Sequence, residues 1–316
     1  MYRRLLGILV IGLLAGAAYW SGSRRPPQTD APPDLHVAVE ERNPWTHLRL
    51  NNDPADFQFA IVSDRTGGYR AGVFRRAVGV LNLLQPQFVL SVGDLVEGYT
   101  EDRSVAESQW RDFEAEVGRL QMPFFYVPGN HDLANEFMSG LWRERHGRRY
   151  YHFVYRDVLF LVLNSDDPPG GAGGIGPDQL AYVRRALEEN RGARWTVVCL
   201  HRPLWTDSQV ERTGWLDVER ALADRPYTVF AGHVHSFKKY VRQGRDYYQL
   251  ATTGGDSEMR GLSHGEVDQI AWVTMKKDGP LIANVLLDGI CTSDLKKPGG
   301  NDPQPPPGDM AVRWKR

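Results

Sequence analysis

Five short apolar runs in this sequence each end in residues that could bind a metal ion or move a proton. The runs cover 59–64, 88–94, 124–130, 195–201 and 227–233. In chain order, the polar residues at or just after their ends are Asp64, Asp94, Asn130, His131, Asp132, His201, His233 and His235. Carboxylate, amide and imidazole donors without a thiolate suit Mn, Fe or Zn better than they suit a closed structural zinc site. The pattern therefore predicts metal-dependent chemistry.

A pair of metal ions is a plausible arrangement for this donor set. Two cations about 3.5–4 Å apart need one ligand that touches both, and the two oxygens of a carboxylate can form such a bridge. Asp94, at the end of the second run, is the candidate bridge. His131 is followed by Asp132, and an imidazole polarised by a carboxylate suits general acid chemistry.

The apolar runs themselves predict buried β-strands, because β-branched and aromatic residues cluster in them between glycine, proline and polar residues. Their polar ends would lie at the carboxyl edge of a sheet, where α/β proteins bind ligands. Apolar residues at helical spacing predict helices over 73–84 and 104–120 and after Pro177, which suits a first helical turn. Strands that alternate with helices indicate parallel pairing in the first half.

The second half of the chain predicts mostly β-structure. Runs 150–155 and 158–164 are close neighbours, as in a hairpin. The later runs 247–252, 270–275 and 281–287 have no long helix between them. Two mixed sheets packed face to face, with helices outside, satisfy both halves, so the predicted fold class is α/β.

Three motifs carry a family resemblance. Gly93-Asp94, Gly129-Asn130-His131-Asp132 and Gly232-His233-Val234-His235, in this order with His201 between the last two, resemble the calcineurin-like metallophosphoesterases, the superfamily that includes the purple acid phosphatases. The resemblance covers about Phe57 to Leu287 and implies a four-layer αββα sandwich.

The resemblance also implies roles for the residues. One metal would be held by Asp64, Asp94 and His235, and the other by Asp94, Asn130, His201 and His233. His131 would be a non-ligand histidine that faces the scissile ester oxygen, as a proton donor or transition-state stabiliser. Asp132 would be the carboxylate that orients it.

The first cluster departs from the family pattern. Relatives usually read Asp-x-His there, whereas this chain reads Asp64-Arg65-Thr66, with a hydroxyl in place of an imidazole. Either Thr66 or a water fills the position weakly, or this metal is more labile, or the enzyme works with one tightly held ion. Fewer strong donors predict weaker metal binding at the site with Asp64 and His235.

Candidate substrate contacts lie close to these clusters. Arg65 precedes a glycine-rich turn, and its guanidinium either clamps a phosphate oxygen or pairs with an acidic loop residue. The other candidates are Thr66, Arg202 and His264.

Length and charge limit the partners. The chain has 316 residues, of which 41% are hydrophobic, enough for a sizeable core. With a net charge of −1, the protein as a whole does not attract nucleic acid or an anionic membrane surface electrostatically. The sequence also lacks a basic stripe or an aromatic platform, so nucleic acid is not an expected partner. The oligomeric state stays open.

The N-terminus predicts export. Residues 1–25 contain a basic start, an uncharged run over 5–20 and the small residues Ala15-Gly16-Ala17, as in a signal peptide. An uncleaved membrane anchor through residues 4–20 is the alternative. The protein is expected outside the cytoplasm, in the periplasm, secreted or anchored.

The remaining segments follow from composition. Residues 26–50 read as a proline-rich linker, 51–290 as the metallophosphoesterase domain and 291–316 as a second proline-rich segment, expected to be disordered. Cys199 and Cys291 are expected to be free thiols.

Together these features predict a metal-dependent phosphoester hydrolase with two divalent or trivalent ions of Mn, Fe or Zn. In the expected mechanism a metal-activated water attacks phosphorus in line while His131 helps the leaving oxygen. The substrate is a small-molecule or macromolecular phosphoester, either a monoester or a diester. The alternatives are a catalytically impaired binding or scaffolding protein on the same fold, and a single-metal phosphoesterase.

Overall fold

The computed structural model describes residues 34–290, and the chain divides into two units between Asp53 and Pro54. Residues 34–53 contain no helix or strand. Within them, the Asn43 side chain closes a turn by accepting from the Glu40 N–H and donating to its carbonyl, each at 2.8 Å.

Several predicted segments lie outside the described residues. They are the export segment 1–25, the beginning of the linker and the C-terminal segment with Cys291. Along residues 34–290, no helix combines the length and the apolar character that crossing a bilayer requires.

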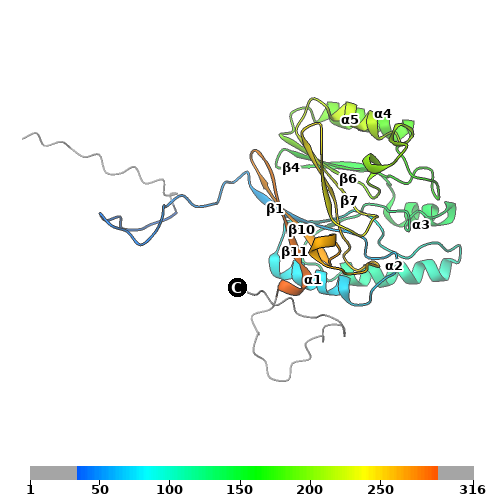
Figure 1. Cartoon of the computed structure of the whole chain (residues 1–316), viewed down its shortest axis with the longest axis horizontal. Coiled ribbons are helices and arrows are strands. Elements are labelled where there is room, and N and C mark those ends of the chain that lie inside the picture. The colour runs from blue at the N-terminus through cyan, green and yellow to red at the C-terminus, as the bar shows by residue number, and fades with distance from the viewer. Residues whose placement is uncertain (1–33, 291–316) are drawn as a thin grey trace, which may run out of the picture. The chain divides into compact units, whose positions relative to one another are not determined.

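The first sheet of the folded unit has five strands. They are β1 (Phe57–Val62), β2 (Val89–Ser91), β3 (Phe124–Phe125), β10 (Gln269–Lys276) and β11 (Gly279–Leu286). Their order is β11-β10-β1-β2-β3. Figure 1 labels β11, β10 and β1. β1, β2 and β3 run parallel, whereas β10 pairs antiparallel with both β1 and β11, so the sheet is mixed.

The second sheet has six strands. They are β4 (Tyr151–Tyr155), β5 (Val158–Val162), β6 (Trp195–Cys199), β7 (Tyr227–Ala231), β8 (Lys238–Arg242) and β9 (Arg245–Gln249). The order is β4-β5-β6-β7-β9-β8, with parallel pairing from β5 to β9 and an antiparallel strand at each edge.

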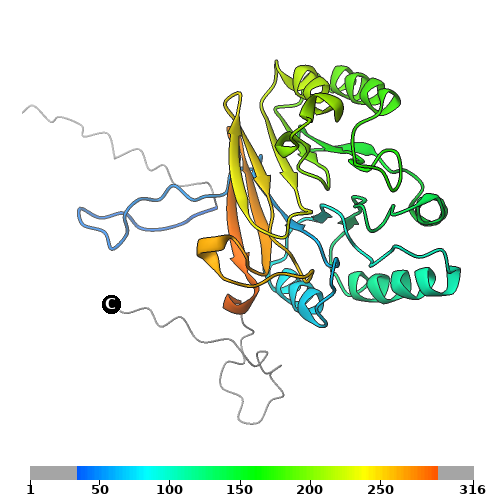
Figure 2. The same cartoon turned by 45° about the vertical axis from the view of Figure 1, so that its right-hand side comes forward.

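Five α-helices cover the outer faces of the sheets. They are α1 (Val73–Leu84), α2 (Arg103–Val117), α3 (Glu136–His146), α4 (Pro177–Glu189) and α5 (Trp215–Leu222). α1, α2 and α3 pack against the first sheet, and α4 and α5 pack against the second (Figures 1 and 2). Short 3-10 helices cover Leu204–Thr206, Val210–Arg212, Leu262–His264 and Leu287–Gly289.

The two sheets face each other across an aromatic core. Phe59 of β1 stacks on Phe88 and meets Phe160 of β5 edge to face at 5.1 Å. Both sheets contribute buried side chains to this layer. Burying one such side chain stabilises a fold by about 1.5–3 kcal/mol, so the layer holds the sheets firmly together. The arrangement of helices, sheet, sheet and helices is the predicted four-layer αββα fold.

Local sequence explains where the helices begin. Asp102 accepts the main-chain N–H of Ser104 at 2.8 Å and of Val105 at 3.3 Å, and so caps α2. Asn135 caps α3 in the same way through the Met138 N–H. Pro177 is the first residue of α4, as predicted.

Three elements were not predicted, and one strand is shorter than expected. α3 contains Ser139 and Gly140, which are weak helix formers, and the short α5 was also missed. β8 is a polar edge strand without an apolar run. Only Phe124–Phe125 of the run 124–130 pairs in the sheet, because the chain leaves the sheet edge before Pro128.

Candidate metal centre

The carboxyl ends of four strands, a parallel pair in each sheet, bring the predicted ligands together. Asp64 follows β1, Asp94 follows β2, His201 follows β6, and His233 and His235 follow β7. Four of these five residues have left-handed backbone, with φ of 41° at Asp64, 56° at Asp94, 74° at His233 and 58° at His235. Non-glycine residues rarely adopt this conformation, and such strain is concentrated at functional sites.

Two glycines of the motifs are required by close approach to the ligands. A Cβ atom on Gly129 would lie 2.2 Å from Oδ1 of Asp94, and one on Gly232 would lie 2.2 Å from Oδ2 of Asp64. Any side chain at either position would displace a carboxylate of the site.

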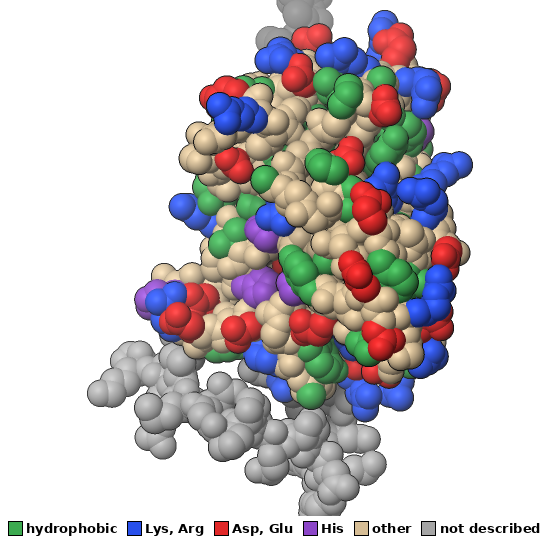
Figure 3. All heavy atoms as spheres, turned by 90° about the vertical axis from the view of Figure 1, so that its right-hand side faces the viewer, with side chains coloured by type: hydrophobic (Ala, Val, Ile, Leu, Met, Phe, Trp, Pro, Cys, Tyr) green, Lys and Arg blue, Asp and Glu red, His purple; other side chains and the backbone are tan. Residues whose placement is uncertain are grey.

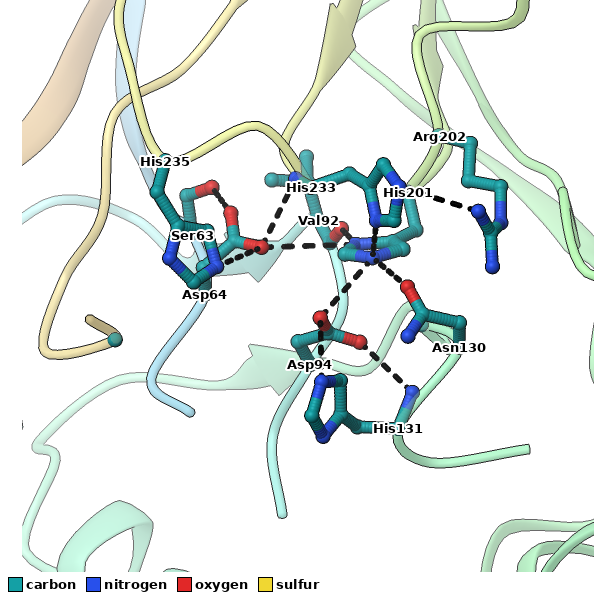
Figure 4. A network of polar contacts seen from close by, with 12 residues as sticks. Ser63, Asp64, Val92, Asp94, Asn130, His131, His201, Arg202, His233 and His235 are labelled. Carbon is teal, nitrogen blue, oxygen red and sulfur yellow. Dashed lines mark hydrogen bonds and ion pairs between the residues drawn. The ribbon is translucent and has the colours of Figure 1, made fainter. Parts of the chain in front are cut away.

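The first ligand group is centred on the buried ring of His201. Its Nε2 atom lies 2.9 Å from Oδ1 of Asn130, 3.1 Å from Nδ1 of His233 and 3.2 Å from Oδ2 of Asp94 (Figure 4). The Nδ1 atom of His201 lies 2.9 Å from the carbonyl oxygen of Val92, which can only accept. Nδ1 therefore carries a hydrogen, and Nε2 is the atom turned toward the other ligands.

The second ligand group consists of Asp64, Asp94 and His235. Nε2 of His235 lies 3.4 Å from Oδ1 of Asp64, while its Nδ1 contacts the carbonyl oxygen of Asp256. Oδ1 of Asp64 also accepts the main-chain N–H of His233 at 2.9 Å. Asp94 belongs to both groups, as the predicted bridge must.

The buried groups shift one another's pKa values. Burial alone would lower the pKa of His201, but Asp94, Asp64 and Asp166 raise it to about 10. Burial would raise the pKa of Asp94, and His201 outweighs this and lowers it to about 2. Burial and the neighbouring His201 lower the pKa of His233 to about 3. The carboxylates thus create a negative potential that favours a cation.

These residues fit a pair of cations. In each group the three donor atoms lie within 4.8 Å of one another, and all donors are carboxylate oxygen or imidazole nitrogen. Asn130 adds an amide oxygen to the first group. This donor chemistry suits Mn, Fe or Zn and does not select among them.

His131 lies beside both groups without belonging to either. Its Nδ1 atom lies 2.7 Å from the carbonyl oxygen of Glu97, and its Nε2 atom lies 3.9 Å from Oδ2 of Asp94. The carbonyl fixes the ring so that Nε2 faces the site. Histidine side chains reach the surface at the centre of the face shown in Figure 3, where a substrate can approach.

Asp132 does not orient His131, and this prediction was wrong. Its Oδ1 atom accepts the main-chain N–H groups of Leu95 at 2.9 Å and Val96 at 3.1 Å, and Oδ2 accepts that of Gly129 at 2.8 Å. Both carboxylate oxygens accept main-chain N–H groups, and these hydrogen bonds connect the loop after β2 to the loop after β3. The main-chain carbonyl of Glu97 orients His131 instead.

Arg65 is not placed as a phosphate clamp: it pairs with an acidic residue, as in its alternative interpretation, but that residue lies on helix α2 and not in a loop. The side chain is buried, its Nε atom lies 3.0 Å from Glu116 of α2, and one NH1 hydrogen goes to the carbonyl of Leu95 at 3.1 Å. Its guanidinium lies 4.3 Å from the ring centre of Tyr69. These contacts anchor the loop after Asp64 to α2.

Thr66 is also buried, and its hydroxyl has no hydrogen-bond partner among the described residues. Burial would raise the pKa of the nearby Glu97, but the dipole of this hydroxyl and the N–H groups of Tyr69 and Gly68 lower it. The predicted part for Thr66 in substrate or metal binding stays a prediction.

Arg202 and His264 differ in position. Nε of Arg202 lies 2.6 Å from Oδ1 of Asp166, and its NH1 atom lies 3.1 Å from Nε2 of His233, so the guanidinium borders the first ligand group (Figure 4). His264 is exposed on a 3-10 turn beside Ser263, and its role stays a prediction.

Two residues of the site were not predicted from the sequence. Asp166 follows the run 158–164, so the strand-end signal that identified the ligands could have found it. Tyr99 carries no such signal, although its hydroxyl lies 3.0 Å from Nδ2 of Asn130.

Comparison with known proteins agrees with this geometry. Over 201 residues the chain is 25% identical to a probable cyclic nucleotide phosphodiesterase of a Pseudoalteromonas species, covering 61% of this chain and 73% of the relative. It is 24% identical over 126 residues to a probable glycerophosphodiester phosphodiesterase of Arcobacter nitrofigilis, covering 38% of this chain but only 43% of that protein.

A solved structure shares the fold. The purple acid phosphatase from yellow lupin, Lupinus luteus, superposes with a TM-score of 0.57 at 14% identity, over 74% of this chain and 52% of that one. The chain thus spans about half the length of the lupin phosphatase and of the Arcobacter protein. The family profile of the calcineurin-like phosphoesterases matches residues 34–237, more than half of the sequence. The chain therefore belongs to the calcineurin-like phosphoesterase family.

Proposed function

We propose that this protein hydrolyses phosphoesters, and that phosphodiesters are its preferred substrates. The observation that carries the proposal is the sharing of Asp94 by two ligand groups, with the non-ligand His131 at 3.9 Å from it. Two relatives carry the names of probable phosphodiesterases, which supports the diester preference.

Each residue then has a task. When bound, two cations supply polarisation of the phosphoryl oxygens and a lowered pKa for a nucleophilic water. Asp94 spans the two ligand groups and fixes their separation. Arg202, held by Asp166 at 2.6 Å, is placed to bind a phosphoryl oxygen at the edge of the first group. His131 is placed to give a proton to the leaving oxygen.

A binding or scaffolding function on the same fold is the rival, because Thr66 replaces a histidine of the family pattern. The position of His131 favours the enzyme. A scaffold has no need for a histidine that is fixed by a carbonyl at 2.7 Å, turned toward the ligands and outside both ligand groups.

A phosphoester panel separates the two functions. We expect turnover of bis(para-nitrophenyl) phosphate in the presence of Mn²⁺, slower turnover of para-nitrophenyl phosphate, loss of both activities with EDTA and recovery when Mn²⁺ is returned. Metal content is measured on the same samples. A protein that holds Mn²⁺ but turns over no phosphoester would support the scaffolding function.

Thr66 predicts unequal affinity at the two sites. The group with Asp64 and His235 has fewer strong donors than the group with His201 and His233, so calorimetric titration with Mn²⁺ should show a weaker and a tighter site. Thr66→His should tighten the weaker site by adding an imidazole donor.

Thr66→Val is the matched control, since it removes the hydroxyl and keeps the shape. Unchanged Mn²⁺ affinity in Thr66→Val means that the hydroxyl is not a ligand. Two equally tight sites in the unaltered protein would contradict the prediction.

A further inference from the structure

Tyr99 lies at the mouth of the metal centre in a conformation that tyrosine rarely adopts. Its side chain is 62% exposed and its φ is 48°, in the left-handed region. The preceding residue must be glycine, because a Cβ atom on Gly98 would lie 1.8 Å from the carbonyl oxygen of His131. The loop after Asp94 is therefore pressed against the loop that carries His131.

The contacts of Tyr99 place it between a metal ligand and the predicted proton donor. Its hydroxyl oxygen accepts a hydrogen bond from Nδ2 of Asn130 at 3.0 Å, while Oδ1 of Asn130 faces His201. Its ring meets the ring of His131 edge to face, with centres 4.8 Å apart and an angle of 88° between the planes.

These contacts leave two features of the side chain for a ligand. The hydroxyl oxygen is the acceptor toward Asn130, so its own hydrogen can be donated elsewhere. More than half of Tyr99 is open to solvent. Its aromatic ring is therefore available as a surface on which another ring can pack. A ring that served only to pack against His131 would not need this exposure.

We propose that Tyr99 contacts the organic group of the substrate on the His131 side of the metal centre, and that it makes the site prefer a planar, ring-bearing group there. The proposal rests on the function proposed above, because His131 marks the side on which the ester group leaves. Tyr99 is then a specificity-determining residue that also positions Asn130.

Two phosphonates test the proposal without turnover. Phenylphosphonate and methylphosphonate carry the same charged phosphonate group, joined through a P–C bond that hydrolysis does not cleave. They differ in the organic group, which is a phenyl ring in the first and a methyl group in the second. Their dissociation constants are measured by calorimetry on the Mn²⁺-loaded protein. We expect Tyr99→Ala to reduce the preference for phenylphosphonate about threefold to tenfold, the effect of losing one aromatic pair. Affinity for methylphosphonate should stay within about twofold.

Two further variants serve as controls. Tyr99→Phe keeps the ring and removes the hydroxyl, so it should keep the preference for phenylphosphonate. Gln243→Ala places alanine at another exposed position with positive φ, 50°, in the turn between β8 and β9. This turn precedes β9 and lies at the end of the strand opposite to the site, so the variant should match the unaltered protein in both affinities.

The outcomes distinguish the possible roles. If Tyr99 acts only through Asn130, both Tyr99 variants weaken Mn²⁺ binding and lower the two phosphonate affinities equally, which overturns the proposed substrate contact. An unchanged preference in Tyr99→Ala also overturns it. If the unaltered, Mn²⁺-loaded protein binds neither phosphonate, the proposed function fails together with this inference.

Discussion

Asp94→Asn is expected to remove metal from both ligand groups and to lower turnover about 10³-fold or more. Asp94 is the residue that the two groups share, so its loss affects both sites at once. An asparagine could still accept the main-chain N–H of His131, which Asp94 does at 3.0 Å, but its NH₂ group would then face Nε2 of His201. Loss of a bound cation removes several kcal/mol of transition-state stabilisation, and each 1.4 kcal/mol is about tenfold in rate.

The measurement is Mn²⁺ titration by calorimetry together with the rate on bis(para-nitrophenyl) phosphate. Glu219→Gln is a matched control, because Glu219 of α5 is a buried carboxylate outside both ligand groups that pairs with Arg242 of β8 at 2.7 Å. That variant should lose thermal stability and keep its Mn²⁺ sites. Normal Mn²⁺ stoichiometry in Asp94→Asn would show that Asp94 is not the bridge.

The metal ligands could be predicted from sequence because each lies at the end of a buried strand. Parallel strands of one sheet end at one edge, so Asp64 and Asp94 lie together after β1 and β2, and His201 and His233 lie together after β6 and β7. The packing of the two sheets then brings Asp64 next to His233. The same reasoning applies to Asp166, which follows β5 and could have been predicted from its position at a strand end. Strand ends therefore carry most of the information about this site.

The roles of residues within the loops could not be predicted in this way. The pairing of Arg65 with Glu116 depends on where α2 packs, and the acceptor for His131 is a main-chain carbonyl that every residue possesses. The position of Tyr99 depends on two successive left-handed residues, whose effect on the chain path is not readable from residue type. Sequence patterns give the layers and ligands, whereas loop geometry decides which neighbours orient them.

His131→Ala is expected to lower turnover about 10²–10⁴-fold while both metal sites keep their affinity, which is the loss typical of a missing general acid. The substitution removes the ring and keeps the main-chain N–H that donates to Oδ1 of Asp94 at 3.0 Å, so the bridging carboxylate stays in place. His201→Ala is the contrasting variant, because it should lose metal as well as activity.

The leaving group shows whether the lost ring supplied a proton. Para-nitrophenolate needs little protonation to depart, whereas phenolate needs more, so His131→Ala should slow diphenyl phosphate more than bis(para-nitrophenyl) phosphate. A ring that only shapes the site would slow both diesters by the same factor, since the two substrates differ mainly in the basicity of the departing oxygen. If His131→Ala slows both diesters by the same factor, His131 acts in binding or positioning and not as the proton donor. If the variant loses Mn²⁺ as His201→Ala does, His131 is a metal ligand, which would contradict its position outside both groups.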